Sequence, residues 1–159
     1  MKDLSPEEHL DIFLRAHRTV GQRLSQTFAD AGAVPPSEAR LLTVISRTLD
    51  HRMRIDALSQ EMSMTKSAVS RIVDRLEREG FVQRETSSAD RRAVYAVMTP
   101  EGRNALRHVT RVFRAAFKDV FLGSLSVAEM NLLSSLMERL DEANQGGREA
   151  PLAEAQAVR

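Results

Sequence analysis

One short stretch of the chain combines an apolar stripe with side chains that can bind nucleic acid. Residues 65–79 read TKSAVSRIVDRLERE. The apolar residues in it recur at helical spacing, at Val69, Ile72, Val73 and Leu76. The spacing therefore predicts a helix with one face in a core. The other face would carry Ser67, Ser70, Arg71, Asp74 and Arg78.

The polar face of this predicted helix has the side-chain types that read DNA. Serine hydroxyls donate and accept, so Ser67 and Ser70 can meet base edges or phosphates, and Arg71 can donate two parallel bonds to O6 and N7 of guanine. Lys66, at the start of the helix, would reach a phosphate, and the free amides there add donors for an anion. The simpler alternative is that these residues form an ordinary solvated face.

A second basic cluster follows in the segment TSSADRR, residues 86–92. It is flanked by FVQRE and AVYAVMT, which are rich in β-branched or aromatic residues and indicate the two strands of a hairpin. Arg91 and Arg92 would then lie at its tip, where Arg92 can enter an adjacent minor groove. Asp90 would orient a neighbouring arginine through paired hydrogen bonds.

Helical patterns on the N-terminal side supply the elements that would position these residues. Ser5, Pro6 and Glu8 form a helix start with a capping box, and Gly32 ends that helix. A second helix follows Pro35 and Pro36, with Ser37 as its expected cap. The segment HRMR, residues 51–54, is interpreted as a basic turn. It leads into a short helix, IDALSQEM, whose inward residues would be Ile55, Leu58 and Met62.

The C-terminal side predicts two further helices. Gly80 can cap the Ser/Arg helix, and Thr99 with Pro100 opens a long helix of about six turns that Gly123 breaks. Ser126 and Glu129 form a second capping box at the start of the last helix. The final residues, 145–159, have little periodicity and are expected to be a tail.

Composition bounds the class of protein. The chain has 159 residues, 42% of them hydrophobic and 28% charged, which predicts one globular domain with or without an appendage. Because 23 basic residues face 22 acidic ones, the net charge is only +1, and DNA binding must depend on where the arginines lie. No cysteine is present, which excludes disulfides and thiolate chemistry. Without a signal peptide or an apolar run long enough to cross a bilayer, we expect a cytoplasmic protein.

The order of elements is that of a winged helix-turn-helix: short helix, tight turn, Ser/Arg helix, glycine, strand, basic loop, strand. The segment IDALSQEMSMTKSAVSRIVDRLEREGFVQRETSSADRRAVYAVMTPEGRNAL resembles the winged-helix core of the MarR family of bacterial transcriptional regulators, including DRR in the wing and MTPEG at the next helix. The resemblance covers roughly residues 5–144. Two departures are Ser63, where many such turns have glycine, and the missing cysteine, which excludes the thiol-based peroxide sensors of the family.

The resemblance implies a mainly α fold with a small β-hairpin wing. Residues 1–36 would hold the N-terminal dimerisation helix, 37–98 the winged helix-turn-helix region and 99–144 the C-terminal dimerisation helices. It also implies a homodimer on a pseudo-palindromic operator, often a repressor, released by a small phenolic or anionic ligand. By position, Ser67, Ser70 and Arg71 would contact bases or phosphates, and Arg92 the minor groove with Asp90 as support.

Apolar content supports the dimer independently. The stripes of the first helix and the last two helices exceed what a small winged domain can cover, so a second copy would bury them. Two-fold symmetry would then place the recognition helices about 10 to 10.5 base pairs apart on DNA.

A ligand pocket is expected between the first helix, the second helix and the helix that begins at Thr99. His17, Arg18, Arg40 and His51 are candidate anchors by type, although a core histidine or a surface arginine is the simpler interpretation of each. A zinc-sensing variant is conceivable, but His9, His17, His51 and His108 lack close ligand spacing, and no metal or cofactor is expected.

Two other classes of function compete with DNA binding. An enzyme is disfavoured, because the sequence has no glycine-rich phosphate loop, no recognisable pair of catalytic carboxylates and no nucleophile with an evident base. A winged-helix module that binds protein is the stronger alternative. It would be expected to expose aromatic or aliphatic anchors, whereas this helix and wing offer small polar and basic groups.

Overall fold

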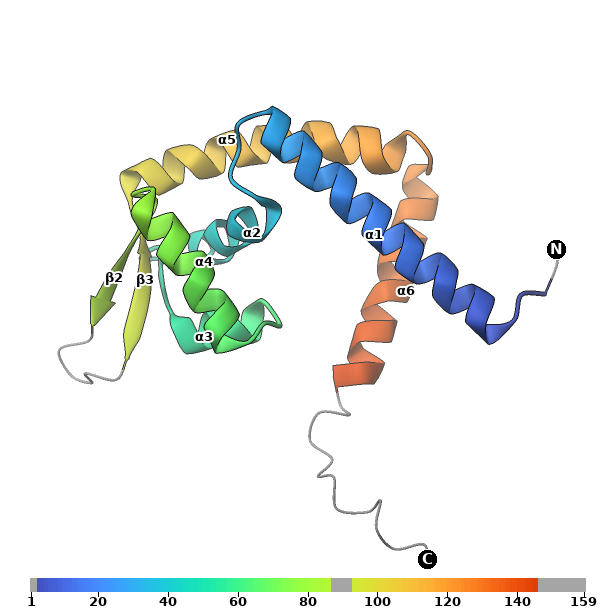
Figure 1. The fold of residues 1–159 in the computed structure, drawn as a ribbon, viewed down its shortest axis with the longest axis horizontal. Helices are drawn as coiled ribbons and strands as arrows, with labels where there is room; N and C mark the ends of the chain where they lie inside the picture. Colours follow the sequence, from blue (N-terminus) through green and yellow to red (C-terminus); the bar gives the residue numbers. More distant parts are fainter. Residues whose placement is uncertain (1–2, 87–92, 146–159) are drawn as a thin grey trace, which may run out of the picture. The chain divides into compact units, whose positions relative to one another are not determined.

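The computed structural model describes residues 3–86 and 93–145, apart from the side chain of Gln145, and it is mainly helical with one small sheet (Figure 1). This confirms the predicted fold class. The helices are α1 (Pro6–Asp30), α2 (Pro36–Ser46), α3 (Ile55–Glu61), α4 (Lys66–Arg78), α5 (Pro100–Phe117), the π-helix η1 (Lys118–Leu122) and α6 (Val127–Gln145). The strands are β1 (Arg52–Arg54), β2 (Val82–Thr86) and β3 (Val94–Met98). The chain divides into two compact units, residues 1–117 and 118–159.

The core of the first unit gathers α2, α3 and α4 against the sheet (Figure 1). The four apolar residues predicted to face inward from α4, Val69, Ile72, Val73 and Leu76, are at most 3% exposed. The three inward residues predicted for α3, Ile55, Leu58 and Met62, are buried as well. The helical spacing therefore identified the core face of both helices of the helix-turn-helix correctly.

The sheet has three antiparallel strands in the order β1-β3-β2, one more than the predicted hairpin. The prediction that residues 51–54 form only a basic turn was wrong, because Arg52 pairs with Val97 and Arg54 with Tyr95. This strand is three residues long and mostly charged, so it has no local strand signal. It forms because β3 offers it a free edge, and the Arg52 guanidinium lies 4.1 Å from the Tyr95 ring centroid.

Helix starts follow the predicted caps in two of three cases. Ser5 and Glu8 make the reciprocal bonds of a capping box at α1, and Ser126 and Glu129 do so at α6. The predicted cap Ser37 was wrong: α2 begins one residue earlier, at Pro36, with Pro35 as its N-cap. Proline suits the first helical position because its φ angle is already helical and its missing N–H would have no partner there.

The MTPEG segment makes a close junction between the sheet and α5. The Thr99 hydroxyl donates to the Gly80 carbonyl at 2.7 Å and accepts from the Gly102 amide at 3.0 Å, which caps α5. A Cβ on Gly102 would lie 2.1 Å from the Phe81 carbonyl oxygen, well inside van der Waals contact. Glycine is required here because the helix approaches the backbone that leads into β2.

The long helix predicted from Thr99 to Gly123 was wrong in its last turns. The α-helix ends at Phe117, and Lys118–Leu122 continues as a π-helix. The Gly123 amide donates to the Lys118 carbonyl at 3.0 Å, five residues back. Apolar residues still recur at helical spacing at Val120 and Phe121, so periodicity did not reveal the change.

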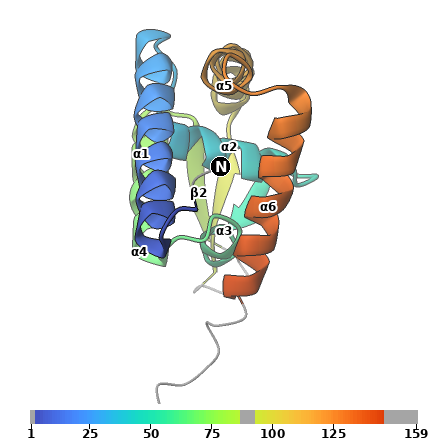
Figure 2. The same ribbon diagram turned by 90° about the vertical axis from the view of Figure 1, so that its right-hand side faces the viewer.

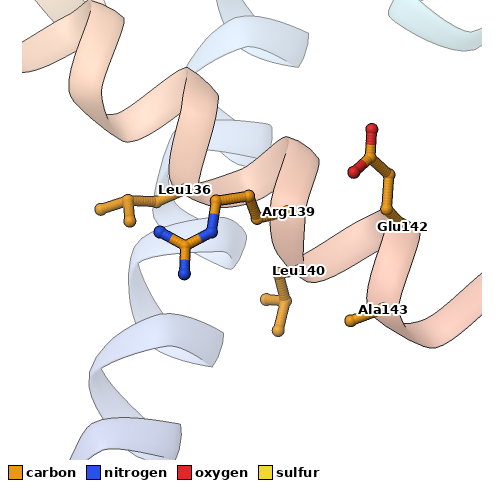
Figure 3. Close-up of a pocket in the computed structure, with 5 residues that line it drawn as sticks. All are labelled: Leu136, Arg139, Leu140, Glu142 and Ala143. Atoms are coloured by element: carbon orange, nitrogen blue, oxygen red, sulfur yellow. The ribbon is translucent and has the colours of Figure 1, made fainter.

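The helix α6 of the second unit has no buried side chain among those described. Large apolar side chains are instead exposed along it, at Val127, Leu132, Leu136, Met137 and Leu140. Leu136, Arg139, Leu140, Glu142 and Ala143 line a hollow of about 660 Å³ on this helix, and the Glu142 carboxylate points away from Leu140 and Ala143 (Figure 3).

No single helix in residues 3–86 and 93–145 is long and apolar enough to cross a membrane, although the bent pair 100–122 and 127–144 together meets the length and composition criteria.

Candidate nucleic-acid interface

The turn between α3 and α4 sets the angle at which α4 is presented. Ser63 adopts the left-handed conformation, with φ of 52°, at the position where glycine is common in such turns. For a residue with a Cβ this conformation costs about 1 to 2 kcal/mol. Three bonds hold the turn: the Met62, Ser63 and Met64 amides donate to the carbonyls of Leu58, Gln60 and Ser59, each at 3.0 Å.

The exposed face of α4 presents Ser67 and Arg71 to solvent. The helix begins at Lys66, and the Thr65 hydroxyl caps it by accepting from the Ala68 amide at 3.3 Å. Ser67 lies in the first turn, 3.2 Å from the Thr65 hydroxyl oxygen. Arg71 is exposed, and within the described part of the chain its guanidinium has no hydrogen-bond or ion-pair partner. Its five donors are therefore available to an external ligand.

Ser70 differs from Ser67 because its hydroxyl accepts a hydrogen bond from a side chain of another element, whereas the Ser67 hydroxyl pairs with Thr65 in its own turn. The Arg84 guanidinium, from β2, donates to the Ser70 hydroxyl at 3.1 Å and to its carbonyl at 3.3 Å. The same guanidinium donates to Asp74 at 2.5 Å and to Glu77 at 2.7 Å. Arg84 therefore joins the first strand of the wing to three positions on one side of α4.

Sequence reasoning missed Arg84, and its electrostatics are consistent with a structural role. Partial burial alone would lower the pKa of Arg84, but hydrogen bonds to Glu77 and Asp74 outweigh it and raise the pKa above its ordinary value. The side chain therefore stays charged at any physiological pH. Asp74 and Glu77, three residues apart on the helix preceding the strand, were the available signal for a basic partner.

Lys66 also has a partner in the structure. Its ammonium group forms an ion pair with Asp56 of α3, and the hydrogen bond from Lys66 lowers the pKa of the Asp56 carboxyl below its ordinary value. Both side chains are largely exposed, so the pair is worth little to stability. It places the ammonium at the N-terminus of α4, where an anion would also meet the amides of the helix.

A buried carboxylate fixes α4 from its other side. Glu38 of α2 is 2% exposed and forms an ion pair with Arg75, whose guanidinium is partly exposed. A buried ion pair that loses one partner leaves an uncompensated charge, which strongly disfavours any motion that separates the two helices. No local pattern indicated this pair, since nothing distinguished Glu38 from a surface glutamate near a helix start.

The predicted tip of the wing lies outside the described residues. The two strands are paired up to Thr86 and Val94. Asp90, Arg91 and Arg92 fall between these two positions in the sequence, so their proposed roles stay predictions.

A cavity of about 500 Å³ lies between α1, α2 and α5, the place where a ligand pocket was expected. Figure 2 looks along α5, with α1 and α2 beside it. The cavity is lined by Leu24, Phe28, Pro36, Ala39, Arg40, Thr43, Arg47, Val109, Thr110 and Phe113. Its wall is thus mostly apolar, with two arginines and two threonines.

Of the four candidate ligand anchors, Arg40 lines this cavity and the other three do not. His17 and Arg18 are exposed on α1. His51 lies between α2 and β1 with φ of 50°, and its buried Nδ1 has no hydrogen-bond partner among the described residues. Arg47 was missed by the sequence analysis. In the part of the chain that the structure describes, no group of three or more His, Asp or Glu side chains could hold a metal ion.

Comparison with known proteins agrees with this architecture. A family model described as "MarR family" matches residues 34–93. The chain is 28% identical over 136 residues to the HTH-type transcriptional regulator PrsX of Escherichia coli, covering 84% of this chain and 81% of that protein. It is 30% identical over 119 residues to a Thauera aromatica protein named "Putative transcriptional regulatory protein for hcr operon", covering 75% of this chain and 70% of that one.

Among solved structures, the chain resembles Sco3205, a MarR family transcriptional regulator from Streptomyces coelicolor in complex with DNA. The TM-score is 0.80 at 25% sequence identity, covering 90% of this chain and 91% of that one.

Proposed function

This chain belongs to the MarR family of winged-helix transcriptional regulators, and from that premise we propose that it is a homodimeric repressor of a pseudo-palindromic DNA operator. The observation that carries the proposal is the exposed face of α4, where Ser67 and Arg71, a residue without an ion pair among the described residues, lie on a helix held from two sides by ion pairs. A helix fixed in this way already holds its hydrogen-bond donors in place, so binding in a major groove does not have to order the helix first.

The proposed contacts divide into base reading and phosphate binding. Arg71 and Ser67 would meet base edges, and Lys66 a phosphate at the start of α4. Ser70 would contribute through its second hydroxyl lone pair or proton, because Arg84 already occupies one site on it. Arg91 and Arg92 would reach the minor groove beside it, with Asp90 orienting them.

The homodimer is supported by apolar surface that each unit leaves uncovered. On α1, Leu10, Ile12, Phe13 and Leu14 are 42% to 58% exposed. On α6, five large apolar side chains are at least 39% exposed, two of them beside the hollow of Figure 3. Because α1 and α6 both expose large apolar side chains, a second copy of the chain is favoured as the partner that would bury them.

Release by a ligand is supported by the cavity between α1, α2 and α5. Its volume suits a small aromatic compound, its apolar wall would cover the ring, and Arg40 and Arg47 would favour a negative charge. A regulator that acts on DNA in this way needs no enzymatic activity, and access to a bacterial chromosome requires a cytoplasmic location.

The test is selection of bound duplexes from a random DNA pool with the full-length protein. The proposal predicts enrichment of an inverted repeat whose half-sites lie about 10 to 10.5 base pairs apart. If no sequence is enriched, the DNA-binding proposal fails, and the exposed face of α4 would have to serve a protein partner.

A further inference from the structure

Arg40 joins two parts of the molecule that the proposed function treats separately. It lies on α2, where its side chain lines the cavity. Its two terminal nitrogens donate to the carbonyl oxygens of Glu61 and Met62, each at 3.2 Å. Glu61 is the last residue of α3 and Met62 is its C-cap. One guanidinium therefore belongs both to the cavity wall and to the helix that precedes the recognition turn.

The end of α3 depends on this guanidinium for a positive charge. The last turn of α3 has no basic residue of its own, although the free carbonyls and the helix dipole favour a cation there. Arg40 supplies it from another helix. The residue directly after the two acceptors is Ser63, which the turn holds in the left-handed conformation.

A carboxylate in the cavity would compete with these two carbonyls. A carboxylate carries a full negative charge, which a carbonyl lacks, and it can accept two parallel hydrogen bonds from one guanidinium, so it is the stronger partner for arginine. Arg47 lies seven residues further along α2, about two turns, and also lines the cavity. Its guanidinium has no partner within the described residues, so it is available to attract the same anion.

We propose that Arg40 is a latch: without ligand it holds the C-terminal end of α3, and a small aromatic carboxylate bound in the cavity draws its guanidinium away. The α3–α4 turn then loses two hydrogen bonds next to its strained residue. The ion pairs of Arg75 and Arg84 still hold the later turns of α4, but α3 and the first turn of α4 are no longer held in the arrangement that suits the major groove. An uncharged ligand of the same shape fills the cavity but leaves the latch closed. This inference rests on the proposed ligand response and names its chemistry and its route.

The experiment uses the full-length protein, benzoate as probe and benzamide as its uncharged counterpart. The variants are Arg40→Met, which removes the latch and keeps most of the side-chain volume, and Arg47→Met, the same change at a cavity residue that does not contact α3. Calorimetry measures ligand binding, and hydrogen exchange follows the amides of Ser63 and Met64 without any DNA. Polarisation measures the affinity for the selected duplex.

The latch predicts that benzoate accelerates exchange at Ser63 and Met64 and weakens DNA binding by roughly 5- to 150-fold, the usual range of coupling between two sites. Benzamide should do neither. Arg40→Met should exchange fast without ligand and show no further response to benzoate. Arg47→Met should exchange as slowly as wild type without ligand and bind benzoate more weakly.

Several results would overturn the latch: no binding of benzoate, an equal response to benzamide, or wild-type exchange and response in Arg40→Met. If Arg40→Met does not fold, Arg40→Lys replaces it, because lysine keeps the charge but lacks the fork that reaches two carbonyls. That variant should show intermediate exchange, and wild-type exchange in it would count against the latch. If no duplex is bound specifically, the regulator proposal fails, while exchange at the turn still decides the latch.

Discussion

At the scale of single residues, the polar face of α4 has two groups of side chains: one binds neighbouring elements and holds the helix in place, and the other is exposed to solvent. Arg84 binds Ser70, Asp74 and Glu77, and Glu38 binds Arg75. Within residues 3–86 and 93–145, Ser67 and Arg71 have no comparable contact with another element. The helical spacing placed both groups on the same polar face and did not distinguish them. The tertiary contacts show which side chains position the helix and which are available to a ligand such as DNA.

Arg84→Met should both destabilise the chain and weaken its binding to DNA. The change leaves Asp74 and Glu77 without their shared cation, so we expect a loss of about 1 to 3 kcal/mol in the free energy of unfolding. Urea denaturation measures this loss, and polarisation measures the affinity for a selected duplex. Arg103→Met, on the exposed side of α5, is the control and should change neither. Unchanged DNA affinity in a destabilised Arg84→Met protein would show that Arg84 does not position α4 for binding.

Lys66→Met should raise the pKa of Asp56. The folded-state pKa of Asp56 lies below its ordinary value of 3.8 because Lys66 donates to it. Because the folded-state pKa of Asp56 is depressed, its pairing with Lys66 stabilises the folded protein at pH values above the unfolded-state pKa. This stabilisation is lost as the pH falls through the folded-state pKa. An NMR titration should therefore show the Asp56 midpoint rising toward 3.8 in Lys66→Met. The Glu129 midpoint, which the Ser126 side chain lowers, should stay the same.

An Asp56 midpoint unchanged by this substitution would mean that Lys66 is not held at α3 in solution.

At the scale of helices and strands, the sequence predicted those elements whose own residues show a helical spacing or a capping pattern. The α4 core face and the capping boxes at Ser5 and Ser126 were correct, because helical spacing and caps are local features. β1 was missed because only pairing with β3 makes it a strand. The end of α5 was misplaced because a π-turn leaves apolar spacing nearly intact. Glu38 and Arg84 were missed because their partners lie on other elements, and only the fold brings them together.

Gly102→Ala should destabilise the junction between α5 and the sheet. The new methyl group would lie 2.1 Å from the Phe81 carbonyl oxygen, so backbone must move. Overpacking of this kind costs roughly 1 to 3 kcal/mol, which thermal or urea unfolding would detect. The control is Gly21→Ala in the middle of α1, where no atom lies within 4 Å of the added Cβ. That change should stabilise the protein by about 0.5 to 1 kcal/mol. Equal effects of the two substitutions would contradict the close approach at Gly102.

At the scale of the whole molecule, association and DNA binding depend on particular surfaces. The net charge is only +1, so general attraction to DNA is weak, and in the proposed function the local cations of α4 and the wing would have to provide it. The uncovered apolar faces of α1 and α6 would provide the dimer.

Leu136→Glu should shift the protein from dimer to monomer. Leu136 is 44% exposed on α6, and a charge there would be buried without a partner in the proposed interface. Sedimentation equilibrium of the full-length chain measures the change. Ser134→Glu is the matched control, since two residues place it on the opposite side of the helix. A wild-type monomer, or a Leu136→Glu dimer of unchanged affinity, would remove α6 from the interface.

Sequence reading by α4 is tested by a polarisation titration of a selected duplex and a scrambled one, at two salt concentrations, with wild type and Arg71→Ala. Salt is varied because phosphate contacts make affinity steeply salt-dependent. We expect wild type to prefer the selected duplex by at least about 10³-fold and Arg71→Ala to lose roughly 1 to 3 kcal/mol of binding free energy on that duplex alone. Equal losses on both duplexes, or no preference in wild type, would contradict sequence reading by α4.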